Sequence, residues 1–140
     1  MAALNKGVKM TWFGHATFLY ETPGGKRIMV DPWIWNNPAC PDNLKSFGKL
    51  DAMLITHGHF DHIMDAVQAA QEGKPDDVVC ILEVGNWLER KGVGGLIAMN
   101  KGGTVDVQGV KVTMLHADHS CGIQDDDGSI IYGGEAVGYM

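Results

Sequence analysis

Residues 51–62 have the sequence Asp-Ala-Met-Leu-Ile-Thr-His-Gly-His-Phe-Asp-His, in which a short apolar run leads directly into three histidines and an aspartate. The apolar run, residues 52–56, predicts a short buried strand. The polar end, residues 57–62, gathers imidazole and carboxylate side chains, which are the ligands that Zn²⁺ and similar divalent ions accept. The stretch therefore predicts a strand that ends in a metal-binding loop.

The spacing within this loop suggests two groups of ligands. His57 and His59 are separated only by Gly58, so on an extended turn both imidazoles can point the same way. Asp61 and His62 fall on the following turn, where they can face a second ion. Asp61 also has a simpler interpretation, as the cap of the helix that follows. That interpretation does not account for three neighbouring histidines, so we favour metal binding.

Two further histidines, His116 and His119, follow a second predicted strand over residues 110–115. Ligands in open α/β sheets gather at the carboxyl ends of strands, so both histidine groups can lie at one edge. A site on the first loop needs a third ligand from elsewhere, and His119 is the best candidate. For His116, and for the isolated His15, we expect a structural role or a role in orienting a ligand.

The remaining sequence alternates strand and helix patterns. One hairpin is predicted, with residues 10–13 and 16–21 in its first arm and residues 27–31 in its second. Helices are predicted over residues 63–71, ended by Gly73, and over residues 83–91, ended by Gly92. Further strands are predicted at residues 78–82, 104–107, 110–115, 129–132 and 136–139. Strands and helices alternate between residues 52 and 91, which indicates a βαβ unit and a parallel or mixed sheet.

Length, charge and cysteine content restrict the class of protein. The 140 residues predict one domain. The formal net charge of −6 disfavours binding to nucleic acid. Cys40, Cys80 and Cys121 are widely spaced, so we expect reduced thiols and a cytoplasmic location. Residues 1–6 have no apolar region behind them, so no signal peptide is expected, and no apolar run is long enough for a membrane span.

The loop sequence His-Gly-His-Phe-Asp-His resembles the His-x-His-x-Asp-His motif of the metallo-β-lactamase superfamily. Other segments are similar to its UPF0173, or lactonase-like, branch of metal-dependent hydrolases. Those segments are residues 11–18, 30–33, 112–120 and 132–139. The resemblance extends over essentially the whole chain. It implies an α/β fold of the αββα sandwich type, with mixed sheets and helices on the outer face.

The resemblance also implies a set of ligands and a mechanism. His57, His59 and His119 would hold one metal ion, and Asp61 and His62 would hold the other. In the family's mechanism two ions lower the pKa of a shared water, which attacks a carbonyl or phosphoryl centre. Asp61 would orient that nucleophile and take up a proton. We expect one or two divalent ions, Zn²⁺ first, with Mn²⁺ and Fe²⁺ as alternatives.

The sequence departs from the family pattern at its end. Family members continue past the point that matches Met140 with a segment whose aspartate bridges the metals, and later with a final histidine. We therefore expect residues 1–140 to form a metallo-β-lactamase-like hydrolase domain that corresponds to the N-terminal half of the fold. Such a half would assemble as a homo-oligomer or with a complementing C-terminal half.

Two functions from different classes follow. The first is a metal-dependent hydrolase that uses a metal-activated water on a small ester, lactone or phosphodiester. The second is a non-catalytic metal-binding half-domain, or a truncated fragment, that needs a partner chain to complete the site. A nuclease of the same superfamily is disfavoured by the acidic charge. A flavodiiron-type redox centre is disfavoured because His59 stands where that group has a carboxylate. No membrane partner is expected.

Overall fold

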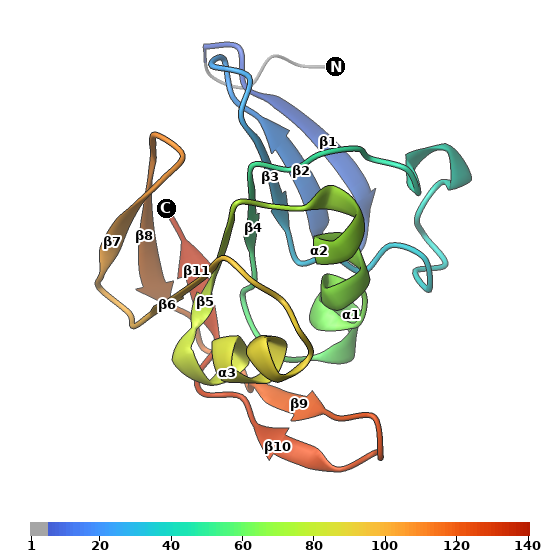
Figure 1. The fold of residues 1–140 in the computed structure, drawn as a ribbon, viewed down its shortest axis with the longest axis vertical. Helices are drawn as coiled ribbons and strands as arrows, with labels where there is room; N and C mark the ends of the chain where they lie inside the picture. The colour runs from blue at the N-terminus through green and yellow to red at the C-terminus, as the bar shows by residue number, and fades with distance from the viewer. Residues whose placement is uncertain (1–5) are drawn as a thin grey trace.

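The computed structural model describes residues 6–140. The prediction about a signal peptide rests mainly on residues 1–5, which lie outside the described part. Its elements form a large six-stranded sheet, a small three-stranded sheet and a separate hairpin (Figure 1). The strands are β1 (Lys9–Gly14), β2 (Thr17–Glu21), β3 (Arg27–Val30), β4 (Ala52–Leu54), β5 (Asp77–Ile81), β6 (Leu96–Met99), β7 (Thr104–Val107), β8 (Val110–His116), β9 (Gly122–Gln124), β10 (Ile130–Tyr132) and β11 (Val137–Tyr139). The helices are α1 (Phe60–Ile63), α2 (Ala66–Gly73), α3 (Leu82–Arg90) and the 3-10 helix η1 (Asp42–Leu44). Within residues 6–140, no helix is long and apolar enough to cross a membrane.

The large sheet is mixed, with its strands in sequence order from β1 to β6. The strands β1, β2 and β3 pair antiparallel, whereas β3, β4, β5 and β6 pair parallel. The parallel pairs arise because each connection crosses over: the long loop with η1 leads from β3 to β4, and helices lead from β4 to β5 and from β5 to β6. Its central strands are apolar on both faces, and Met53, Val78 and Val79 are fully buried. The expected α/β class with mixed sheets is confirmed.

The chain reverses direction at Gly14, so the first arm of the predicted hairpin is in fact two strands. Gly14 and His15 have φ angles of 102° and 50°, and β1 pairs antiparallel with β2 across this turn. A side chain at position 14 would lie 2.8 Å from the backbone carbon of Ala39, so only glycine fits. Strand-forming residues on both sides hid this reversal from the sequence pattern. Its consequence is that His15 lies at the tip of a tight turn.

The single helix predicted over residues 63–71 is two helices, α1 and α2, with a break before Asp65. The buried Asp65 carboxylate accepts hydrogen bonds from Ile34 N at 2.5 Å and Trp35 N at 2.8 Å, and Asp65 N donates to Pro32 O at 3.2 Å. These bonds fix the long loop after β3 against the helices, and they replace the bonds of a continuous helix. The predicted ends of α2 at Gly73 and of α3 before Gly92 are confirmed.

Two short strands, β6 and β9, were absent from the sequence prediction. The four residues of β6 follow a glycine-rich segment and have no alternating burial, so their pattern is weak. The three residues of β9 pair only with β10, in a hairpin that extends from one end of the molecule (Figure 1). Ile130 and Tyr132 on β10 remain 70% and 74% exposed.

The small sheet, in the order β11-β8-β7, joins the large one next to the histidine loop. Val137 N donates a hydrogen bond to Thr56 O at 2.9 Å. The hydroxyl of Tyr139 donates to Ile55 O at 2.7 Å and also lies 3.2 Å from Val79 O. Strand β11 is therefore bonded to the chain directly before His57. This joint brings the end of β8 close to the end of β4.

Candidate metal centre

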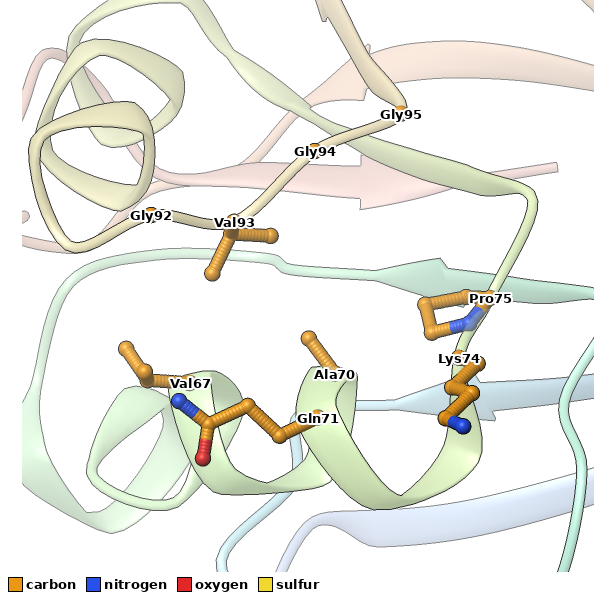
Figure 2. Close-up of a pocket in the computed structure, with 9 residues that line it drawn as sticks. All are labelled: Val67, Ala70, Gln71, Lys74, Pro75, Gly92, Val93, Gly94 and Gly95. Carbon is orange, nitrogen blue, oxygen red and sulfur yellow. The ribbon is translucent and has the colours of Figure 1, made fainter.

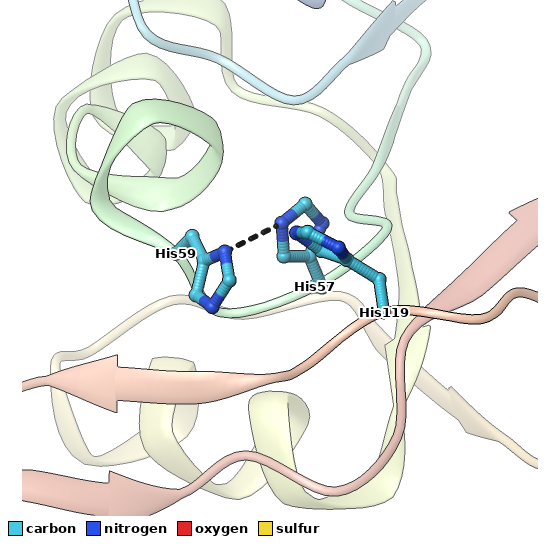
Figure 3. A group of neighbouring side chains, drawn as sticks. All are labelled: His57, His59 and His119. Carbon is cyan, nitrogen blue, oxygen red and sulfur yellow. Dashed lines mark hydrogen bonds between the residues drawn. The ribbon is translucent and has the colours of Figure 1, made fainter.

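Three histidines from two sheets converge at this joint, and we refer to His57, His59 and His119 as the first cluster (Figure 3). Their nearest ring nitrogens all lie within 4.8 Å of one another, and His57 Nε2 is 3.2 Å from His59 Nδ1. His57 and His59 lie on the loop after β4, whereas His119 lies on the loop after β8. The structure thus brings His119 to the two histidines with which the sequence had grouped it.

Hydrogen bonds behind the rings orient two of these imidazoles. Thr56 Oγ1 donates to Asp31 Oδ2 at 2.6 Å and lies 2.9 Å from His57 Nδ1. Because the threonine proton is already used, this oxygen accepts from His57 Nδ1–H, and the His57 Nε2 lone pair faces the cluster. Ser120 Oγ lies 3.0 Å from His59 Nε2, so His59 presents its Nδ1 to the cluster.

His57 is the buried member of the first cluster, with 5% of its surface exposed. Burial, followed by the neighbouring His62, His59 and His119, lowers the pKa of His57 to about 3, while Asp61 opposes the shift. Removing a cationic imidazolium from water is costly, and nearby imidazoles add repulsion. His57 is therefore neutral near pH 7 and offers a lone pair rather than a charge.

A second group lies beside the first, and we refer to His15, Asp61 and His62 as the second cluster. His15 Nε2 is 2.9 Å from Asp61 Oδ2 and 3.3 Å from His62 Nε2, and the latter two atoms are 4.0 Å apart. Asp61 lies inside α1, whose N-cap is His59 with no side-chain capping bond. Asp61 therefore does not act as a helix cap. The structure also adds His15, for which the sequence indicated only a supporting role.

Asp31 connects the two clusters and was missed as a functional candidate. It is 2% exposed, and its carboxylate accepts from Thr56 N at 2.7 Å and from His62 Nδ1 at 2.8 Å, besides Thr56 Oγ1. Asp31 thus supports the His62 ring directly and the His57 ring through Thr56, and the centroids of these two rings are 4.0 Å apart. A usable signal was present, because Asp31 ends the strand predicted over residues 27–31 and precedes a proline.

His116 lies apart from both clusters among the described residues. Its ring is 60% exposed, with Nε2 2.9 Å from Asp118 Oδ1 and Nδ1 3.3 Å from Lys101 Nζ. Trp33, on the loop after β3, lies edge-on to His15 with ring centroids 5.6 Å apart. It also packs against Phe60 at 5.8 Å, so Trp33 forms one side of the second cluster.

The clusters, rather than the apolar cavity beside α2, mark the region with reactive side chains. A cavity of about 350 Å³ between α2 and the loop before β6 is lined mainly by glycine and apolar residues, with no histidine or carboxylate (Figure 2). A cavity of about 510 Å³ instead opens beside His59, Asp61 and His119, with Phe60 and Ile130 as apolar walls. Imidazoles and a carboxylate therefore face a space that can admit a small molecule.

Comparison with known proteins identifies the family. The family model described as Beta-lactamase superfamily domain matches residues 26–140. The chain belongs to this superfamily. It is 57% identical to a UPF0173 metal-dependent hydrolase of Koribacter versatilis over 135 residues, which cover 96% of the chain and 57% of that relative. It is 52% identical to a UPF0173 metal-dependent hydrolase of Solibacter usitatus, over 95% of the chain and 56% of that relative. The resemblance inferred from the motif is confirmed, and the chain spans just over half the length of these relatives.

Solved structures agree on the fold. Igni18, described as a novel metallo hydrolase from the archaeon Ignicoccus hospitalis, is 34% identical and aligns with a TM-score of 0.75 over 95% of this chain and 55% of its own. CmlA, a diiron β-hydroxylase from Streptomyces venezuelae, aligns with a TM-score of 0.64 at 21% identity, over 94% of this chain and 27% of its own. The second likeness supports the fold alone. The expected metallo-β-lactamase fold is confirmed.

Proposed function

We propose that this superfamily domain carries the metal-binding part of a hydrolase that acts on a small ester, lactone or phosphodiester through a metal-activated water. The observation that carries the proposal is the convergence of His57, His59 and His119 from two sheets. Imidazole nitrogens that converge on one point, with hydrogen-bonded atoms behind His57 and His59, suit a divalent cation.

In this proposal each cluster has a distinct role. His57, His59 and His119 would hold one ion, and Asp61 and His62 would contribute to a second position beside it. A divalent ion would supply Lewis-acid activation of water and of a carbonyl or phosphoryl oxygen. An all-imidazole set favours Zn²⁺, and Mn²⁺ or Fe²⁺ would also be accepted at the carboxylate-containing cluster.

The chain's own residues would handle the proton and the substrate. The Asp61 side chain is 25% exposed and lines the 510 Å³ cavity, so its carboxylate is placed to orient a water and accept its proton. Phe60 is half-exposed on the same wall and offers apolar contact to a small organic substrate. The Asp61 carboxylate beside the cavity would disfavour anionic substrates, unless bound cations reverse the local charge.

The test combines metal content with turnover. The wild-type chain, His59→Ala and the control His116→Ala would be loaded with Zn²⁺ or Mn²⁺, then assayed on ester, lactone and phosphodiester substrates. Loss of a residue that only orients a ligand weakens metal binding by up to roughly 100-fold. We expect His59→Ala to weaken metal binding by more than this and to abolish turnover. The control His116→Ala should keep both metal affinity and turnover. Tight metal binding without turnover would favour the alternative, a non-catalytic metal-binding half-domain. Native mass would then show whether a second copy or another chain completes the site.

A further inference from the structure

We propose that His15 is a ligand of the second ion position, so that His15, Asp61 and His62 form a three-residue metal site. The inference rests on the proposed function, since it assumes that this edge of the fold binds divalent ions. It assigns to the β1–β2 turn a role beyond its place in the sheet. It also means that residues of the described chain can supply a complete protein shell for a second ion, with water as a fourth ligand.

The backbone at His15 is built to hold its side chain in one place. His15 has a φ of 50°, in the left-handed region, which non-glycine residues rarely adopt and which is concentrated at binding and catalytic sites. Gly14 fits tightly against Ala39, and Trp12 Nε1 donates to His15 O at 2.9 Å. The turn is therefore fixed on two sides. A residue kept in a strained conformation by such packing is a pre-organised residue.

The separations within the second cluster match a coordination shell. The three distances between ligand atoms are 2.9, 3.3 and 4.0 Å. A tetrahedron with metal–ligand bonds of about 2.1 Å has edges of roughly 3.4 Å, which lies inside this range. A simple ion pair between His15 and Asp61 explains the shortest distance. The contact of 3.3 Å between His15 Nε2 and His62 Nε2 brings a third ligand atom to the same place.

A hydrogen bond on the other side of the His62 ring fixes which nitrogen faces the second cluster. His62 Nδ1 donates to the buried Asp31 carboxylate at 2.8 Å, so the ring turns its Nε2 toward the cluster. Asp61 can only accept when ionised. His15 Nε2, Asp61 Oδ2 and His62 Nε2 thus lie close together, and these three ligand atoms suit a cation. The His15 ring is 42% exposed, which leaves a path for an ion from solvent, while Trp33 packs edge-on against it.

The test uses Zn²⁺ calorimetry and the visible absorption of bound Co²⁺ on the 140-residue chain. His15→Gly removes the imidazole and accepts the positive φ without strain. We expect two ions per wild-type chain, and in His15→Gly an unchanged first ion with at least tenfold weaker binding of the second. Added imidazole should restore that second binding, because a free ligand can enter the exposed gap. The control His116→Ala should bind both ions as wild type does.

The possible outcomes separate this inference from the proposed function. If wild type binds one ion only, or if His15→Gly binds two with unchanged affinities, His15 is not a ligand, while Zn²⁺ at the first cluster leaves the proposed function standing. If no ion binds at all, both fail. Should His15→Gly lose both ions, His15→Asn decides, because asparagine also tolerates the left-handed region. Loss of only the second ion there upholds the inference, and any other result overturns it.

Discussion

The two clusters lie side by side but are assembled in different ways. The first cluster takes its histidines from the ends of β4 and β8, so it forms only when the small sheet is joined to the large one. The second cluster takes its members from the β1–β2 turn and from α1, all within residues 15–62 of the large-sheet region. The first is all imidazole, and the second contains a carboxylate. One site thus depends on the docking of two sheets, and the other depends on one tight turn.

This difference makes the clusters separable by mutation. Changes at the contact between the loop after β4 and the hairpin β9–β10, or at the joint with β11, should act on the first cluster. Changes at the β1–β2 turn should act on the second. Asp31 is the exception, because its carboxylate bonds to His62 directly and reaches His57 through Thr56. A substitution there should affect both.

Gly58→Ala should produce the largest difference between the clusters. A side-chain carbon at position 58 would lie 2.3 Å from Ile123 Cγ1, so the loop or the buried Ile123 side chain must shift. We expect the Zn²⁺ affinity of the first cluster to fall by more than about 100-fold, which is the upper limit for losing a contact that only orients a ligand. The second cluster should keep its ion, because its members lie outside this contact.

The matched control for this change is Gly94→Ala, since a side chain there meets nothing within 4 Å. Calorimetry with Zn²⁺ on both variants would measure the effect. Equal first-cluster affinities in Gly58→Ala and wild type would mean that the loop's position is not what holds the cluster together.

Asp31→Asn should weaken both clusters, by a smaller factor. The amide would place a donor beside Thr56 N, Thr56 Oγ1 or His62 Nδ1, which now donate to the carboxylate. Residues that orient metal ligands contribute about 10–100-fold in affinity, and we expect losses in that range. The metal-free variant should also lose about 1–3 kcal/mol in its free energy of unfolding, the usual cost of an unsatisfied buried polar group.

Asp76→Asn provides the comparison for this variant, because Asp76 is half-exposed and lies 3.5 Å from Lys49 Nζ. Such a surface pair contributes little to stability. Urea unfolding and Zn²⁺ titration of the two variants would separate a general loss of charge from the specific role of Asp31. A fall at one cluster only would show that the coupling through Thr56 is absent.

The sequence was most informative where the chemistry is local. His57, His59, Asp61 and His62 could be grouped because their spacing, and the apolar run before them, lie within a dozen residues. His119 could be placed because the ends of two strands were expected at one edge. The family followed from the same loop. All of these inferences needed only the pattern of neighbouring residues and the known ligands of divalent ions.

His15 and Asp31 escaped because their position depends on pairing between strands. Asp31 reaches the histidine loop because β3 pairs with β4 in a register that places Val30 opposite Leu54. His15 reaches it because the chain reverses at Gly14, which strand propensity on both sides concealed. The helix break before Asp65 has the same origin, since its partners lie in a loop some thirty residues earlier. Such contacts follow from register, which local periodicity does not specify.

The smallest effect is expected at the joint between the sheets, from Tyr139→Phe. The lost hydroxyl donates to Ile55 O at 2.7 Å, directly before the histidine loop, so the free energy of unfolding should fall by about 1–2 kcal/mol. Burial raises the pKa of Tyr139 well above 10, so only the unfolded chain ionises this group as the pH passes 10. The stabilisation by the tyrosine is therefore complete below pH 10 and is lost as the pH rises further.

Urea unfolding of metal-free protein between pH 8 and about 11 would measure this difference. The gap between wild type and Tyr139→Phe should narrow above pH 10, whereas Tyr132→Phe, at a residue 74% exposed, should leave stability unchanged throughout. With Zn²⁺ present, Tyr139→Phe should weaken the first cluster slightly and spare the second, because only the first spans the joint. Equal weakening of both clusters would contradict the view that the second is independent of how the two sheets dock.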